Sequence, residues 1–221
     1  MCRLFLSLSK GSVRMQSYKT VENEAADEFI EQRSRFIGYV KPVTTEEQAV
    51  EFINEKKRLH WDATHNVYAY SLREGQLCRY SDDGEPHGTA GMPALDVIVK
   101  SGVTDVVVVV TRYFGGVLLG TGGLVRAYTK GARIALDAGG VVTMESCTVA
   151  RLSCDYSQYG KVSGLIPASG GVIDDTAFTD KVEISFHIPG DALGTFGKQL
   201  ADATCGEVGA EIVEERYFKK I

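Results

Sequence analysis

The sequence predicts an α+β protein of two domains, and three observations support this prediction. An unbroken run of mostly β-branched residues, from Val106 to Thr111, is typical of a strand buried on both faces. A long helical pattern follows this run and stops at Gly139-Gly140. Beyond these glycines a compact β-α-β-β-α-β series begins. We therefore expect domains at residues 18–141 and 142–221, after a flexible extension at residues 1–17.

The first domain is predicted to open with a strand at residues 34–43, after a polar, acidic stretch. Threonines and glutamates at positions 44–47 supply the cap and the acidic first turn of a helix that ends near the cations at 56–58. The later elements are a strand at 66–72, a helix at 89–100, the buried strand at 105–111 and a helix at 122–138. The last helix has one apolar side, which should pack against the strands.

The second domain is predicted from six short elements taken together. Strands are expected at 143–155, 171–176, 181–188 and 210–218, with helices at 156–166 and 192–203. This order is that of the ferredoxin-like split βαβ unit. The order of all six elements is a stronger indication than any one of them.

Charge is distributed unevenly between the two domains. Residues 1–142 contain 17 Lys and Arg against 17 Asp and Glu, whereas residues 143–221 contain 7 against 12, so the net charge of −5 lies in the second part. This balance argues against a protein that coats nucleic acid through bulk charge. An anionic partner is expected to bind a local patch of the first domain. The acidic second domain is a possible docking surface for a protein partner.

The cysteines and the hydropathy indicate a cytoplasmic protein without a membrane span. Five cysteines are scattered without a Cys-x-x-Cys pair, which favours free thiols in a reducing compartment. No apolar stretch approaches the ~20 residues of a spanning helix, and the apolar run near the start is too short for a signal peptide. Met15 is an alternative to Met1 as the start of translation.

A candidate anion site follows the buried strand. Charge, two aromatic rings and exposed glycine amides come together there, next to a helix with three cations at positions i, i+4 and i+7. The strict P-loop and dinucleotide motifs are absent, and charge with a stacking surface suits RNA. The structural alternative is a set of tight turns. The candidate residues are Arg112, Tyr113, Phe114, Gly115, Gly116, Gly120, Gly122, Gly123, Arg126, Lys130 and Arg133.

A second polar block, SDDGEPHG at residues 81–88, has an open role. Its carboxylates and histidine could hold a hard cation or perform acid–base chemistry, but Asp and Gly also form turns. We predict that the three carboxylates order the loop and pair with nearby cations. No metal, cofactor or catalytic residue is assigned, since neither an HExxH nor a Gly-x-Ser-x-Gly pattern is present. The residues of this block and its neighbour are His65, Asp82, Asp83, Glu85 and His87.

Three stretches resemble the signature of the IMPACT family, in its bacterial YigZ-like branch. They are HNVYAY at residues 65–70, SDDGEPHGTAGMPAL at 81–95 and VVTRYFGGVLLGTGGLVRAY at 109–128, and the resemblance extends from about residue 18 to the end. The resemblance implies a first domain with the fold of ribosomal protein S5 domain 2. It implies a second, ferredoxin-like domain similar to domain V of elongation factor G.

The resemblance also implies a role in translation. Eukaryotic members use an additional amino-terminal RWD domain to bind an activator of a starvation kinase, and that partner is not carried over to this chain. We therefore predict a non-catalytic, translation-associated regulator that binds RNA or the ribosome. The first alternative is an enzyme, either one with a phosphate ligand at the FGGVLLGTGG loop or a metal-dependent hydrolase at SDDGEPHG. The second is a protein-interaction adaptor.

Overall fold

The computed structural model describes residues 16–220, so all but the last two residues of the predicted extension lie outside the described part. The described chain divides into two bodies between Thr143 and Met144. The division falls inside strand β7 (Val141–Cys154), which starts immediately after the glycines that end the preceding helix. Within the described residues, no helix combines the length and apolar character needed to cross a membrane.

The first body contains an antiparallel sheet with the strand order β2-β3-β6-β4-β5. Its strands are β2 (Ala25–Glu31), β3 (Ser34–Pro42), β4 (His65–Leu72), β5 (Leu77–Ser81) and β6 (Val106–Tyr113). Its helices are α1 (Glu46–Leu59), α2 (Gly91–Lys100) and α3 (Gly120–Gly139), with a short 3₁₀ turn η1 at Glu74–Gln76. A further short strand, β1 (Tyr18–Val21), pairs with β7. Strands β1, β2 and β5 were not predicted from the sequence.

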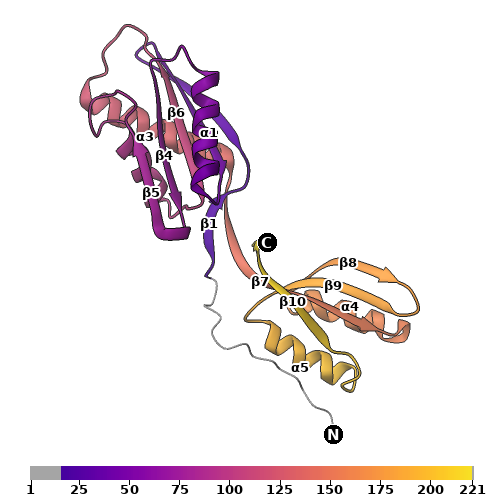
Figure 1. Ribbon diagram of the computed structural model, residues 1–221. Helices are drawn as coiled ribbons and strands as arrows, with labels where there is room; N and C mark the ends of the chain where they lie inside the picture. Colours follow the sequence, from indigo (N-terminus) through magenta and orange to yellow (C-terminus); the bar gives the residue numbers. More distant parts are fainter. Residues whose placement is uncertain (1–15, 221) are drawn as a thin grey trace. The chain divides into compact units, whose positions relative to one another are not determined.

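Helices cover both faces of this sheet, which explains the all-apolar run of β6 (Figure 1). Val106, Val108 and Val110 pack in the core that includes α2 and α3. Val107 and Val109 face the core that includes α1. Every position of the run is therefore buried, and the predicted buried strand is confirmed.

A glycine contact seats α3 on the sheet. A Cβ at Gly38 of β3 would lie only 2.2 Å from the carbonyl oxygen of Gly131 in α3. A Cβ at Gly131 would in turn lie 2.8 Å from a methyl carbon of Val110. The absence of side chains at both positions lets the helix approach the strands closely. This contact fixes where the amino end of α3 and its cations lie relative to β6.

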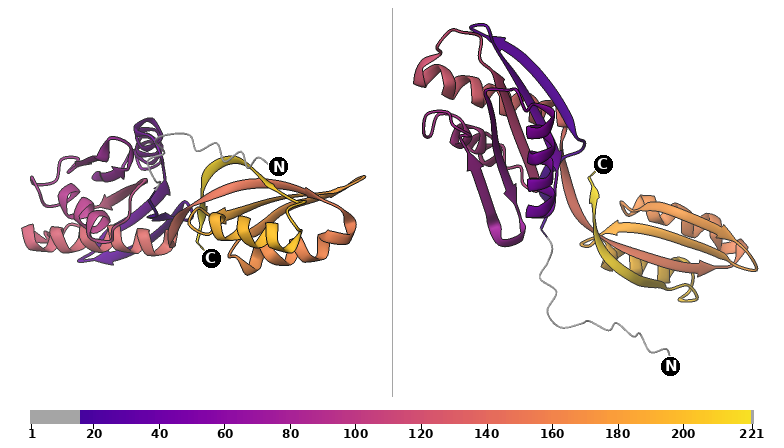
Figure 2. Two further views of the ribbon diagram at one scale, coloured as in Figure 1. Left: turned by 90° about the horizontal axis from the view of Figure 1, so that it is seen from below. Right: turned by 45° about the horizontal axis from the view of Figure 1, so that its top comes forward.

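The second body has the predicted β-α-β-β-α-β order. After β7 come α4 (Tyr156–Ala168), β8 (Val172–Phe178), β9 (Val182–Pro189), α5 (Leu193–Ala203) and β10 (Ala210–Lys219). Strand β7 pairs with β9 and β10, and β8 pairs with β9, all antiparallel. Both helices lie on the same face of this sheet (Figure 2). Alternate residues of β9, such as Ile184 and Phe186, fill the core beneath them.

Candidate functional site

The predicted site residues lie at one end of the first sheet, where β6 ends. The antiparallel register sets His65 at the start of β4 opposite Arg112, and Arg35 at the start of β3 opposite Tyr113. The loop after α1, the loop before α2 and the turn between β2 and β3 meet at this end. We call this surface the β6 tip; it comprises residues 30–35, 60–65, 82–91 and 112–126.

Arg112 is not a surface cation, which corrects the prediction that it contacts a ligand phosphate. Its side chain is only 6% exposed, and its Nη1 lies 2.6 Å from Oε1 of Glu85, which is 3% exposed. The reason is strand alternation, because residue 112 lies on the same buried face of β6 as Val108 and Val110. The predicted pairing of a loop carboxylate with a cation is confirmed by this ion pair.

Glu85 is the centre of a buried polar cluster. The Tyr128 hydroxyl of α3 donates to the same Oε1 at 2.7 Å. Burial and the adjacent carboxylate raise the pKa of Tyr128, so its hydroxyl remains protonated and donates. Nδ1–H of His65 donates to the carbonyl of Asp83 at 2.8 Å, and its Nε2 lies 3.7 Å from Oε1 of Glu85. The loop is thereby fixed to β4, β6 and α3.

Asp82 caps the entry to α2. Its carboxylate accepts from the backbone N–H groups of Gly88, Ala90 and Gly91 at 2.8–3.1 Å. Burial acts to raise the pKa of Asp82, but these backbone donors outweigh it and hold the pKa below the usual 3.8. The helix therefore starts at Gly91, two residues after the predicted start at residue 89.

Asp83 joins the loop to α1 and β4. Its Oδ1 lies 2.6 Å from Nζ of Lys57, and its Oδ2 accepts from the backbone N–H of Asn66 at 2.7 Å. His87 is the exposed member of the block, with a side chain 94% exposed and Nδ1 3.7 Å from Asp82. Among the described residues, no group of three or more His, Cys, Asp or Glu is placed to hold a metal ion. The carboxylates of this loop thus order the backbone around them.

A second polar chain at the tip was not predicted. The Tyr113 hydroxyl donates to Oδ1 of Asp62 at 3.1 Å, so its oxygen accepts from Nδ1–H of His60 at 2.9 Å. Nε2 of His60 then accepts from the hydroxyl of Tyr39 at 2.6 Å. Burial, and secondly the cation of Arg35, lower the pKa of His60 below its usual 6.5. Tyr113 therefore positions the loop at residues 60–64 instead of presenting a free hydroxyl.

The glycine-rich loop leads into a helix end without a side-chain cap. Leu119 occupies the cap position of α3 and makes no capping bond, and the first turn contains no acidic residue. Gly116 and Gly120 have φ values of 80° and 70°, which favour glycine. Gly115 passes against the backbone of Arg33, where a Cβ would lie 2.0 Å from the carbonyl oxygen. The helix starts at Gly120, two residues before the predicted start.

Three exposed cations extend along α3 from this end. Arg126 lies over the first turn, with Nη1 3.6 Å from the position of a Cβ at Gly122. Lys130 and Arg133 are also exposed, and Nζ of Lys130 lies 4.3 Å from the centroid of the Phe29 ring. The sequence contains no Asp or Glu from residue 106 to residue 136. The predicted basic helix face is therefore present on the surface.

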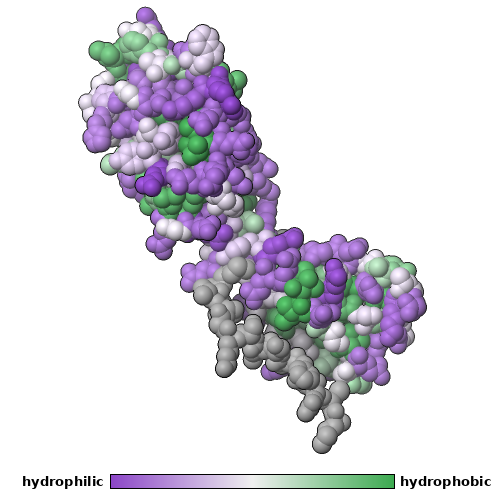
Figure 3. Space-filling model, viewed as in Figure 1, coloured by the Kyte–Doolittle hydropathy of each residue, from purple (hydrophilic) through white to green (hydrophobic). Residues whose placement is uncertain are grey.

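Exposed apolar side chains surround the glycine-rich loop. Phe114 is 44% exposed, Leu118 is 85% exposed, and Trp61 in the loop after α1 is 83% exposed. Hydrophobic residues are visible at the end of the first body drawn uppermost in Figure 3. Three members of the site were not predicted from the sequence: Arg33, His60 and Trp61. Only the lone tryptophan in a polar segment gave a signal that could have been used.

The fold and the site define a two-body α+β protein with an ordered acidic loop beside a basic, uncapped helix. Two family models match the chain: the Impact N-terminal domain over residues 32–136, and a domain of unknown function, DUF1949, over residues 152–207. The chain belongs to the IMPACT family, and the resemblance to its bacterial YigZ-like branch is confirmed.

Bacterial relatives match along nearly their whole length. The chain is 36% identical over 207 residues to IMPACT family member YvyE of Bacillus subtilis (strain 168), covering 93% of this chain and 95% of that protein. It is 34% identical over 186 residues to IMPACT family member YigZ of Escherichia coli (strain K12), covering 83% and 91%.

The other comparisons are a partial match to a eukaryotic protein and a match to a solved structure. Protein IMPACT of Mus musculus is 37% identical over 97 residues, which is 41% of this chain and 30% of that protein. A solved structure titled "Crystal structure of an hypothetical protein" is 32% identical with a TM-score of 0.57, covering 91% of this chain and all of that one. The mixed α+β, two-sheet architecture is therefore shared with a solved relative.

Proposed function

We propose that this protein is a non-catalytic, translation-associated regulator that binds RNA or the ribosome through the basic surface at the β6 tip and along α3. The proposed surface differs from the predicted one in two residues. Arg112 is no longer a phosphate contact, since it neutralises Glu85 instead, while the predicted contacts Arg126, Lys130 and Arg133 remain. Tyr113 becomes a positioning residue, because its hydroxyl is engaged by His60 and Asp62.

The observation that carries this proposal is the amino end of α3. Its free N–H groups have no side-chain cap, and the guanidinium of Arg126 lies over the same turn. Unpaired N–H groups, the helix dipole and a cation together favour a bound phosphate. Lys130 and Arg133 continue the positive surface along the helix, so more than one phosphate of a strand can be neutralised.

We also propose fold assignments for the two bodies. The first would have the fold of ribosomal protein S5 domain 2. The second would be ferredoxin-like, similar to domain V of elongation factor G. The order of its elements, its antiparallel sheet and its two helices on one face support the second assignment. Both folds occur in the translation apparatus, which agrees with the proposed partner, although a fold alone does not define a function.

The salt dependence of RNA binding tests the proposal. Contacts from Arg126, Lys130 and Arg133 to three phosphates should give a log–log slope of about −2 to −3. Replacing Arg126 and Lys130 together by Ala should make the slope shallower by about 1.4 to 1.8, because each lost phosphate contact removes about 0.7 to 0.9. Unfolding should change by no more than about 0.5 kcal/mol, since both side chains are exposed.

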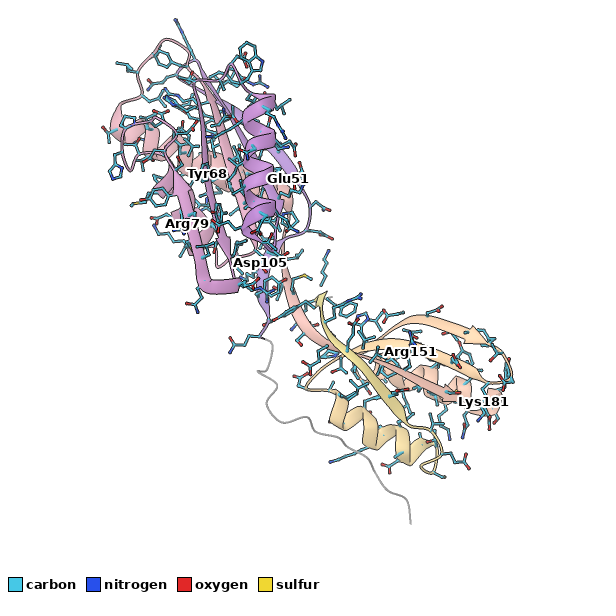
Figure 4. All side chains as sticks on the ribbon, in the orientation of Figure 1. Glu51, Tyr68, Arg79, Asp105, Arg151 and Lys181 are labelled. Carbon is cyan, nitrogen blue, oxygen red and sulfur yellow. The ribbon has the colours of Figure 1, made fainter. Side chains whose placement is uncertain are left out.

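A matched control exists in the second body. Arg151 and Lys181, both labelled in Figure 4, are exposed, and their double replacement by Ala removes the same charge. This control should leave the slope unchanged. Equal effects of the two double variants would show that net charge alone governs binding and would refute a site on α3.

The structure gives different support to the two alternative functions, the enzyme and the protein-interaction adaptor. A hydrolase at residues 81–88 loses support, because Asp82, Asp83 and Glu85 are each engaged by donors within the protein. The adaptor function is favoured by a hollow of about 620 Å³ on the second sheet. The hollow lies on the face turned away from α4 and α5, and Asp175, Glu183 and Glu211 are among its lining residues. Partner binding through this hollow would be insensitive to the loss of Arg126 and Lys130.

A further inference from the structure

We propose that the β6 tip is a stacking site for unpaired nucleobases, formed by Trp61 and Phe114. The ligand class is accordingly RNA with unstacked nucleotides, in a loop, a bulge or a single strand, and not a continuous duplex. This inference rests on the proposed function, since it specifies the kind of RNA that the basic surface binds. It adds a base contact to a surface otherwise described only by its phosphate contacts.

Trp61 is a large, mostly exposed aromatic residue in a firmly held loop. The residue is 83% exposed. On one side the carbonyl of His60 accepts from Ala63 N–H at 3.1 Å and from the Asn66 side chain at 3.2 Å. On the other side Thr64 N–H donates to the carbonyl of Arg112 at 2.9 Å. An ordered backbone that presents an unburied indole is arranged for a contact outside the chain.

Phe114 stands beside this loop with one side supported. Its backbone N–H donates to Oγ1 of Thr64 at 3.0 Å, which ties the strand end to the Trp61 loop. The guanidinium carbon of Arg112 lies 5.3 Å from the centroid of the Phe114 ring. Because Arg112 is itself fixed by Glu85, the ring has a rigid support, and 44% of the residue remains exposed. Two exposed aromatic residues are therefore held by neighbouring backbone segments.

The same segments connect these rings to the phosphate site. Phe114 begins the loop that ends at the uncapped first turn of α3, where Arg126 lies. A bound nucleotide thus has separate partners for its base and its phosphate. Bases inside an A-form duplex are stacked on each other and cannot offer a free face to a side chain, whereas unpaired bases can. The combination of exposed rings with helix-end amides favours unpaired RNA.

Trp61 is the only tryptophan in the sequence, so intrinsic fluorescence reports on this site directly. We expect a single-stranded oligo(A) of twelve nucleotides to quench the fluorescence saturably. A blunt RNA duplex of the same length should give little quenching. Heparin, a polyanion without bases, should displace the oligonucleotide without quenching. Quenching of equal depth by the duplex would overturn the inference.

Variants measured by fluorescence anisotropy of labelled oligo(A) separate stacking from charge. Trp61→Ala or Phe114→Ala should weaken binding roughly 5- to 150-fold at every salt concentration, with an unchanged slope, if each ring stacks on one base. Trp61→Phe should retain most of the affinity, because it keeps an aromatic plane. Leu59→Ala, a change at another exposed apolar residue nearby, should have no effect.

The outcomes of these experiments separate the stacking site from the proposed RNA-binding function. Salt-dependent RNA binding that is unchanged in Trp61→Ala and Phe114→Ala would refute the stacking site and leave the proposed function intact. No binding of oligo(A), duplex or ribosomes by the native protein would refute both. A loss of affinity in Leu59→Ala equal to that in Trp61→Ala would show a nonspecific apolar contact and would also overturn the stacking site.

Discussion

Each end of strand β6 has a buried charge paired with an opposite charge, but the two pairs are arranged in opposite ways. At the amino end, labelled by Asp105 in Figure 4, the buried acid precedes the strand and Arg73 pairs with it at 2.6 Å. At the carboxyl end, the buried arginine lies on the strand and Glu85 enters from a loop, also at 2.6 Å. Each buried charge has an opposite partner, as the low dielectric requires. The ends differ in whether one partner of the pair stays in contact with water.

That difference separates a closed end from an open one. At the amino end the side chain of Arg73 is 34% exposed, and its guanidinium carbon lies 3.5 Å from the centroid of the Tyr18 ring, which covers it. At the carboxyl end both partners of the ion pair are buried, while Phe114 beside Arg112 and Trp61 in the neighbouring loop remain exposed. The ion pair at the amino end serves the stability of the fold. The ion pair at the carboxyl end gives rigid support to an exposed surface that can bind a ligand.

The largest expected effect is the loss of the buried pair at the open end. Glu85→Gln keeps the shape of the side chain and an acceptor for Tyr128, but leaves the cation of Arg112 buried without a counter-charge. Removing one partner of a buried pair costs about 3–5 kcal/mol of unfolding free energy. Urea unfolding followed by Trp61 fluorescence measures this cost in the first body alone. A loss below about 1 kcal/mol would show that solvent reaches Arg112.

The corresponding change at the closed end should be milder. Asp105→Asn keeps an acceptor for the backbone N–H of Arg73, which Asp105 binds at 2.8 Å, and tolerates the φ of 53° at this position. Arg73 retains contact with water, so we expect a loss of about 1 kcal/mol, as for exposed ion pairs. The same urea experiment gives the comparison. Equal losses in the two amide variants would contradict the distinction between open and closed ends.

The sequence allowed the elements with strong local patterns to be predicted. The β6 run, helix α3 and the six elements of the second body each have their own periodicity or cap, and all are observed. Strand β2 was missed because its residues are mostly polar and exposed, so its pairing with β3 leaves little trace in the sequence. Helix α2 started two residues later than predicted because its capping carboxylate, Asp82, lies outside the helical pattern, and α3 started two residues earlier although Leu119 makes no capping bond.

The site was predicted less completely, because its contacts join distant segments. Arg112 follows six residues that are all buried, and such a run hides the alternation that decides which way residue 112 points. Its partner Glu85 is 27 positions away in the sequence. His60 contacts Tyr39 and Tyr113 from two other elements. Composition could indicate cations and aromatic rings in this region, but only the register of β3, β4 and β6 brings these particular residues together.

The smallest expected effect sharpens the comparison at the open end through pH. The pKa of His60 lies below 6.5 in the folded protein, because burial and nearby cations disfavour its charged form. Above pH 6.5 the residue is neutral in both states and contributes no pH dependence. Between 6.5 and the lower folded-state pKa, the unfolded chain binds a proton that the folded protein does not, so the free energy of unfolding falls as the pH decreases. Protonation would also force the Tyr39 hydroxyl to turn from donor to acceptor.

Urea unfolding at pH 7 and at steps below 6.5 should show this decline in the native protein, and His60→Asn should lose it because the amide does not titrate. The effect is small because His60 is partly exposed. An identical pH slope in both proteins would show that the decline arises at groups other than His60 and that protonation of His60 does not destabilise the polar chain at the tip.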